Sequence, residues 1–177
     1  MLPLPALSTD RLELTPLTLD DAEPMVAVLG DARMYEFTGG EPPDVHELRR
    51  RYAVLSTGRS PDGSEWWFNW IVRDRGETAP VGVVQATVAA DLSRSWVAWE
   101  VGVPWQGAGR ASEAAAAMVA WLAEQGVAVI EAAIARDHRA SEAVARRLGL
   151  QPTDDLDDGE VVWRRTFADA GHGAAGA

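Results

Sequence analysis

The chain of 177 residues contains no cysteine and no lysine, because all 16 basic residues are arginine. The missing thiols exclude disulfide bonds, thiolate nucleophiles and cysteine-ligated zinc, and we expect no metal site. Positive charge is also scarce, since 27 acidic residues bring the formal net charge to −11. Neutralising phosphates needs surplus cations, so we do not expect nucleic-acid binding. Such acidity is compatible with amine substrates, although it also serves solubility.

The sequence also lacks the features of a membrane or secreted protein. No apolar run is long enough to cross a membrane, and the first six residues have no basic region and no long apolar core. We therefore expect a cytoplasmic protein with no membrane partner. With 47% hydrophobic residues the chain should fold, and we assign residues 1–167 to one domain. The Gly/Ala-rich tail 168–177 is expected to be disordered.

Hydrophobic periodicity predicts an α/β protein with a mixed sheet of about seven strands and four helices, in the order β-α-α-β-β-β-α-β-α-β-β. Expected strands are 8–16, 66–72, 81–89, 95–103, 127–135, 151–154 and 160–167. Expected helices are about 20–29, 44–57, 110–125 and 138–148. The second to fourth strands should form an antiparallel meander, and the strands flanking the third helix should run parallel. An acidic turn is expected at 154–158.

One glycine-rich stretch stands out, Val101-Gly-Val-Pro-Trp-Gln-Gly-Ala-Gly-Arg-Ala-Ser-Glu113. A strand, a glycine turn and a helix N-terminus follow one another directly. Free backbone N–H groups and the helix dipole then converge on one spot, which is typical of a diphosphate site. The stretch is neither a Walker loop nor a complete dinucleotide fingerprint. On the residues alone, a nucleotide-binding domain of another class and a tight structural connection both remain open.

Three spaced motifs resemble the GCN5-related N-acetyltransferase (GNAT) family, and in particular its ribosomal-protein N-terminal acetyltransferase branch. They are Thr9-Asp-Arg-Leu-Glu-Leu14, Pro104-Trp-Gln-Gly-Ala-Gly-Arg-Ala-Ser-Glu-Ala114 and Asp137-His-Arg-Ala-Ser-Glu-Ala-Val-Ala-Arg-Arg-Leu-Gly-Leu150. The resemblance implies an acetyl-CoA-dependent N-acetyltransferase acting on a protein N-terminus or a small-molecule amine. It is also compatible with a non-catalytic acetyl-CoA sensor or interaction protein. Homodimers are common in the family.

The resemblance implies that the exposed end of the strand pairs with the pantetheine arm and that the turn holds the diphosphate. Gly102 fits a β-bulge, and the N–H of Val101 would polarise the thioester carbonyl. The implied cosubstrate contacts are Val101, Gly102, Val103, Gln106, Gly107, Ala108, Gly109, Arg110, Ala111, His138 and Ser141.

The expected base is Glu100, an acid in an otherwise apolar strand, where loss of solvent would raise its pKa. It could instead face solvent or pair with an arginine. Glu65, Glu131 and His46 are weaker candidates. Many family members carry a tyrosine as the acid at the position of Ala145, whereas the ribosomal-protein branch carries a serine that matches Ser141.

The acceptor amine is expected between the loop that joins the first two helices and the Trp-rich strand that follows them. The residues assigned to this substrate pocket are Tyr35, Phe37, Gly39 and Trp66.

Overall fold

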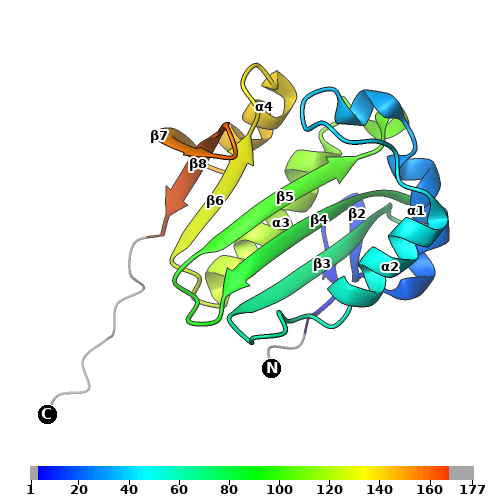
Figure 1. The fold of residues 1–177 in the computed structure, drawn as a ribbon, viewed down its shortest axis with the longest axis horizontal. Helices are drawn as coiled ribbons and strands as arrows, with labels where there is room; N and C mark the ends of the chain where they lie inside the picture. Colours follow the sequence, from blue (N-terminus) through cyan, green and yellow to red (C-terminus); the bar gives the residue numbers. More distant parts are fainter. Residues whose placement is uncertain (1–3, 168–177) are drawn as a thin grey trace, which may run out of the picture.

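Eight strands form a single mixed sheet in the computed structural model, which describes residues 4–167 (Figure 1). Their bounds are β1 Leu7–Ser8, β2 Leu12–Pro16, β3 Glu65–Asp74, β4 Pro80–Ala89, β5 Ser95–Val101, β6 Val129–Ile134, β7 Gln151–Asp157 and β8 Glu160–Thr166. The order across the sheet is β1-β2-β3-β4-β5-β6-β8-β7. The expected disorder of 168–177 lies outside the described residues.

Four α-helices and three short 3-10 helices connect the strands. Their bounds are η1 Leu19–Asp21, α1 Ala22–Leu29, η2 Ala32–Tyr35, α2 Val45–Leu55, η3 Val103–Trp105, α3 Arg110–Glu124 and α4 Arg139–Arg147. Helices α1 and α2 cover one face of the sheet, and α3 and α4 cover the other (Figure 1). Within residues 4–167 no helix is long and apolar enough to cross a membrane.

The predicted order of elements is confirmed, with one strand more than expected. The first strand is divided, because a turn closed by the N–H of Thr9 and the carbonyl of Leu12 (3.0 Å) separates β1 from β2. Strands β3, β4 and β5 form the expected antiparallel meander. Strands β5 and β6, which flank α3, are parallel as expected.

The prediction of an acidic turn at 154–158 is wrong, because most of these residues lie within β7. Strand β7 continues to Asp157, and Asp157 pairs with Glu160 across a two-residue turn. Both turn residues, Asp158 and Gly159, have positive φ values, of 46° and 86°. A tight hairpin of this kind suits an Asp-Gly pair and lets the flanking strands extend fully.

The sheet separates two apolar cores. The larger lies under α3 and α4 and includes Phe68, Trp70 and Val72 of β3. The smaller lies under α1 and α2 and includes Ile71. Because side chains alternate between faces, β3 is buried on both sides over its central part, as its apolar sequence predicted.

The expected bulge at Gly102 is absent, so this prediction is wrong. Strand β4 pairs with the whole of β5 without a shift in register. The next residue, Gly102, continues the ladder by donating its N–H to Val81 O at 3.0 Å. A Cβ on Gly102 would lie 2.8 Å from the Trp105 ring and 2.9 Å from Val28 O. Close packing of η3 and α1 over the backbone therefore explains the glycine.

We predict that Gly102→Ala destabilises the fold by about 1–3 kcal/mol, because the added methyl group meets backbone and ring atoms that have no room to move. Urea unfolding would measure this. Ala98→Ser is the control, since Ala98 is exposed on the same strand and surface changes stay within about 0.5 kcal/mol. Equal stability of the two variants would contradict the packing argument.

Candidate active site

A gap in the sheet between β5 and β6 defines the site. The two strands pair at only two positions, Ser95 with Ile130 and Trp96 with Glu131. Beyond Trp96, β5 continues to Val101 with β4 on one side only. The edge of β5 that faces β6 is thus left free over its second half, where an extended molecule could add as a strand.

The backbone of Val101 points into this gap. Residues of an antiparallel strand alternate between facing their partner strand and facing away from it. Gly102 bonds to Val81 of β4, so the N–H and C=O of Val101 face the β6 side. Its carbonyl accepts a hydrogen bond from Gln106 Nε2 at 2.8 Å. The N–H remains directed at the gap, as an oxyanion donor requires.

The glycine turn connects η3 to the N-terminus of α3 at this end of β5. Gly107 and Gly109 have φ values of 79° and 81°, a conformation that suits glycine. Glu113 is the first residue of α3 to reach back to a carbonyl, that of Gly109 at 3.0 Å. The N–H groups before it, including those of Arg110 and Ala111, have no acceptor within the helix. Together with the helix dipole they form an anion site.

A clamp that the sequence did not reveal holds the turn in place. Arg11 donates to the Glu113 carboxylate from Nε at 2.7 Å and to the carbonyl of Ala108 from Nη1 at 3.1 Å. The hydroxyl of Thr9 donates to the same carboxylate at 2.5 Å. The first motif of the sequence thus supports the second, although Arg11 and Glu113 are 102 residues apart.

A second ion pair fixes the same helix end. The Arg110 guanidinium donates to the Asp74 carboxylate at 2.7 and 2.8 Å, and this hydrogen bonding lowers the pKa of Asp74. The side chains of Gln106 and Arg110 are therefore engaged within the protein. Arg110 offers a ligand its backbone N–H, whereas the N–H of Gln106 bonds to Val103 O at 3.3 Å.

Glu100 lies on the face of β5 that α1 and α2 cover. It pairs with Val83, a member of the smaller core. Burial raises the pKa of Glu100, and the positive charge of Arg51 partly opposes this. The charge of Glu100 also reaches Tyr35, whose pKa is raised first by burial and then by that charge. The pKa shift has the direction that a general base near neutral pH needs.

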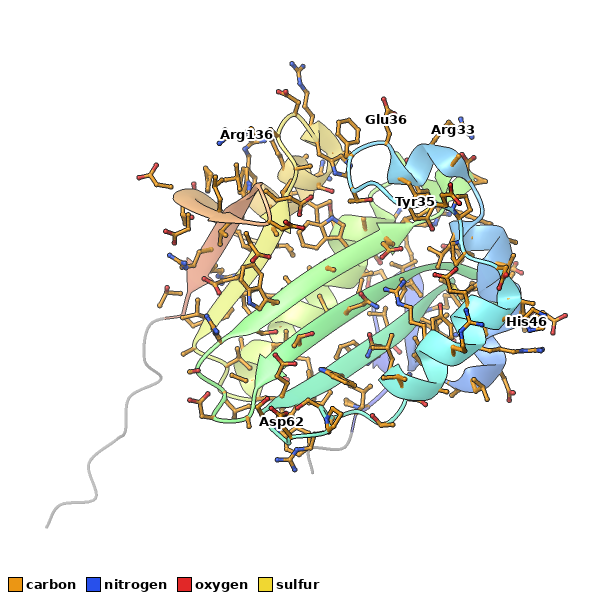
Figure 2. The ribbon with its side chains drawn as sticks, in the orientation of Figure 1. Arg33, Tyr35, Glu36, His46, Asp62 and Arg136 are labelled. Atoms are coloured by element: carbon orange, nitrogen blue, oxygen red, sulfur yellow. The ribbon has the colours of Figure 1, made fainter. Side chains whose placement is uncertain are left out.

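The weaker candidates occupy less suitable positions. Glu131 is buried but paired with Arg164 at 2.6 Å, and Glu65 accepts a hydrogen bond from Trp67 Nε1 at 3.1 Å. His46 is exposed on α2, away from the gap (Figure 2). Within the described part of the chain no cluster of three His, Asp or Glu side chains is arranged to hold a metal.

His138 and Ser141 lie at the N-terminus of α4, next to the loop that follows η2 (Figure 1). The ring of His138 stacks on Phe37 with centroids 4.4 Å apart and planes 6° apart. Its Nε2 is 3.5 Å from Ser141 Oγ. Burial lowers the pKa of His138, which favours a neutral ring. The stack connects the α1–α2 side of the site to α4. Ala145, further along α4, is fully buried and has no hydroxyl group.

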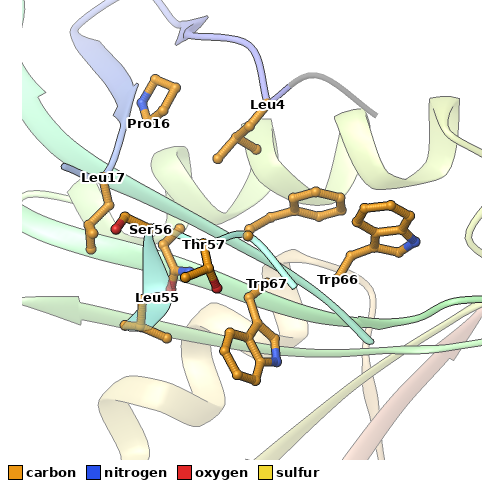
Figure 3. A pocket seen from close by; sticks show the side chains of 11 residues that line it. Leu4, Pro16, Leu17, Leu55, Ser56, Thr57, Trp66 and Trp67 are labelled. Atoms are coloured by element: carbon orange, nitrogen blue, oxygen red, sulfur yellow. The ribbon is translucent and has the colours of Figure 1, made fainter. Parts of the chain in front are cut away.

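The structure brings together some of the residues assigned to the substrate pocket and not others. Tyr35 lies near Glu100, with its hydroxyl bonded to Leu29 O at 2.9 Å, and Gly39 follows in the same loop with φ of 71°. Trp66 is elsewhere, near the start of β3, where it lines a separate pocket with Leu4 and Leu55 (Figure 3). Trp66 pairs with Val88, and Val88 pairs with Ser95, so Trp66 lies at the end of the sheet opposite Val101.

Comparison with known proteins identifies the family. Residues 11–151 match the model of the acetyltransferase (GNAT) domain. The chain belongs to this family. The assignment made from the sequence motifs is thereby confirmed, although no curated protein matches the chain by sequence.

Solved structures support the same GNAT fold. A ribosomal L7/L12 alpha-N-protein acetyltransferase in complex with coenzyme A has a TM-score of 0.76 and 14% identity, covering 92% of this chain and 98% of that one. A ribosomal-protein-S5-alanine acetyltransferase from Vibrio fischeri has a TM-score of 0.72 and 15% identity, covering 93% and 98%. An aminoglycoside acetyltransferase in complex with coenzyme A has a TM-score of 0.71 and 16% identity, covering 88% and 94%.

We predict that Arg11→Ala loosens the N-terminus of α3, because it removes the hydrogen bonds to Glu113 and Ala108. Backbone amides from Glu113 onward, the first in α3 to be hydrogen-bonded within the helix, should exchange hydrogen about tenfold faster, as the loss of one or two charge-assisted hydrogen bonds implies. Arg49→Ala is the control, since Arg49 is exposed on α2 and pairs with exposed Glu23 at 3.4 Å. Equal exchange in both variants would show that the clamp does not order the turn.

Proposed function

We propose that this GNAT domain is an acetyl-CoA-dependent N-acetyltransferase that moves the acetyl group to a primary amine by direct attack. The acceptor is a protein N-terminus or a small-molecule amine. The observation that carries the proposal is the gap between β5 and β6, with an anion site at its end and a half-buried carboxylate beside it.

The groups around the gap fit acetyl-CoA. The free edge of β5 can bond to the amide groups of a pantetheine arm as a further strand would. The glycine turn and the first turn of α3 present N–H groups and a positive dipole to a diphosphate. Two proteins of similar fold hold coenzyme A in their solved structures. His138 and Ser141 would contact the arm from the α4 side.

In the proposed reaction Glu100 and Ser141 each transfer one proton, and Val101 donates a hydrogen bond. Glu100 accepts the proton of the acceptor amine, and the amine nitrogen then bonds to the carbonyl carbon. The N–H of Val101 donates to the carbonyl oxygen as negative charge develops there. The carbon–sulfur bond breaks, and the hydroxyl of Ser141 donates its proton to the leaving thiolate. The acylated nitrogen loses its second proton to solvent, and solvent also takes the proton from Glu100 and restores the proton to Ser141.

The direct test is release of free thiol from acetyl-CoA with a panel of N-terminal peptides and small amines. We expect turnover with at least one acceptor, and a melting temperature that acetyl-CoA raises and NAD or ATP does not. Binding of acetyl-CoA without turnover across the panel would favour a non-catalytic sensor. Stabilisation by NAD alone would contradict the proposal.

We predict that Gly109→Asp weakens acetyl-CoA binding by tenfold or more, about 1.4 kcal/mol, because it adds bulk and negative charge at the anion site. Titration calorimetry would measure the affinity. Gly76→Asp is a matched control, since Gly76 has φ of 82° against 81° for Gly109, and a Cβ added to Gly76 would meet no atom within 4 Å. If both variants lose the same affinity, charge at the turn is not the cause.

We predict that Glu100→Gln lowers kcat by about a hundredfold or more, as loss of a general base implies, with little change in acetyl-CoA affinity. The wild-type rate should rise with pH, because the base must be ionised, and the midpoint should lie above the usual Glu pKa since burial raises it. This rising limb should vanish in the variant. The control Glu124→Gln, on the exposed end of α3, should keep both the rate and the pH profile.

A further inference from the structure

The gap between β5 and β6 is closed at one end by strand pairing and is crossed at the other end by an aromatic contact. The two strands pair at two positions, both at the start of β5. At the other end the strands stop at Val101 and Ile134. Beyond these ends the ring of Phe37 stacks on the ring of His138, with centroids 4.4 Å apart.

Phe37 is attached to the β5 side of the gap. The end of α1 lies on the end of β5, since a Cβ added to Gly102 would be 2.9 Å from Val28 O. The helix η2 is tied to α1 in turn, because the hydroxyl of Tyr35 donates to Leu29 O at 2.9 Å. Phe37 follows two residues later, so its position depends on β5 and α1.

His138 is attached to the β6 side of the gap. It follows the end of β6 by four residues, and its N–H donates to Ala135 O at 3.2 Å. It is the N-cap residue of α4, and its Nε2 lies 3.5 Å from Ser141 Oγ. Figure 1 shows α4 and the loop after η2 beside each other above the ends of β5 and β6. The stack therefore joins the two sides of the gap across its open end.

The loop that carries Phe37 is held by few other contacts. Residues 36–43 make one backbone hydrogen bond, from Gly39 N to Tyr35 O at 2.9 Å. Among the hydrogen bonds, ion pairs and aromatic contacts of residues 4–167, the stack alone joins this loop to α4. Gly39 and Gly40 have φ values of 71° and 92°, and the Phe37 side chain is 42% exposed. A segment with so few contacts opens locally at low cost in free energy.

We propose that the Phe37–His138 stack is a gate, which opens to let the pantetheine arm of acetyl-CoA enter the gap and to let the arm of CoA leave. This inference rests on the proposed function, because it concerns how the same cosubstrate reaches the free edge of β5. The anion site at the N-terminus of α3 lies at this end of β5. An arm whose diphosphate is held there passes the stack on its way into the gap.

A gate affects rates and not affinity. The stack closes again over the bound arm, so its free energy contributes equally to the free and the occupied protein. A contact that is the same in both states cannot shift the equilibrium between them. It slows binding and release by the same factor, as loops that cover a site do.

The test is Phe37→Leu, which removes the ring and keeps an apolar side chain. We expect the association and dissociation rate constants of CoA to rise together, by about two- to tenfold, as the free energy of one aromatic pair implies. The dissociation constant should stay within about twofold of the wild-type value. Stopped-flow fluorescence would measure both rate constants, with CoA and with acetyl-CoA as the probes.

Two further variants serve as controls. Val54→Ala also shortens an exposed apolar side chain, which is 54% exposed on α2, and it should change neither rate constant. Phe37→Tyr keeps an aromatic ring, so it should keep the wild-type rate constants of CoA. Faster release of CoA from Phe37→Leu without faster binding would identify Phe37 as a ligand contact and overturn the gate.

Proton NMR tests the stack without any ligand. Ring protons that lie over an aromatic face are shielded, so the His138 ring signals should be upfield in the wild type and move downfield in Phe37→Leu. The chain has three histidines, so these signals are readily assigned with a His138→Asn variant. Identical His138 shifts in the wild type and in Phe37→Leu would show that the rings do not stack, and would overturn the inference.

The outcomes separate the gate from the proposed function. If the wild type binds neither CoA nor acetyl-CoA, both are overturned. If CoA binds and Phe37→Leu leaves both rate constants unchanged, the gate alone is overturned. If both rate constants rise in a protein that transfers acetyl to no acceptor, the gate is supported and only the proposed reaction is removed.

Discussion

The separation of β5 from β6 is the constraint on which the site depends. Two parallel strands that pair at two positions and then diverge leave a row of backbone N–H and C=O groups without partners. Such groups are costly when they are removed from water, so the divergence must be held by other contacts. The two apolar cores supply these contacts, because side chains of β5 and its neighbours are packed under helices on both faces of the sheet.

The end of the gap depends on charge as well as on packing. An anion site at a helix N-terminus works only if the helix end is held still. Arg110 and Glu113 are both in the first turn of α3. Arg110 makes an ion pair with Asp74 at the end of β3, and Glu113 makes one with Arg11 in the turn before β2. In a chain with this excess of acid, these arginines serve structure, and the groups left to attract an anion are the backbone N–H groups and the helix dipole.

The position of Glu100 depends on the same framework of strands and helices. A carboxylate placed beside an apolar core is costly when ionised, and this cost appears as a raised pKa. The helices α1 and α2 create that environment. The layer that covers this face of the sheet therefore also raises the pKa of Glu100.

The sequence by itself determined the order of the elements, the glycine turn and the presence of an acid in an apolar strand. These features are local, since periodicity and glycine placement act within a few residues. Tertiary structure decided the rest. Three features depend on which faces meet after the sheet forms. They are the clamp between Arg11 and Glu113, the stack of Phe37 on His138 and the distant position of Trp66. Gly102 illustrates this difference. From the local sequence, a glycine after a strand suggests a bulge. In the structure, the glycine is required because Trp105 and Val28, from other elements, lie too close for a side chain.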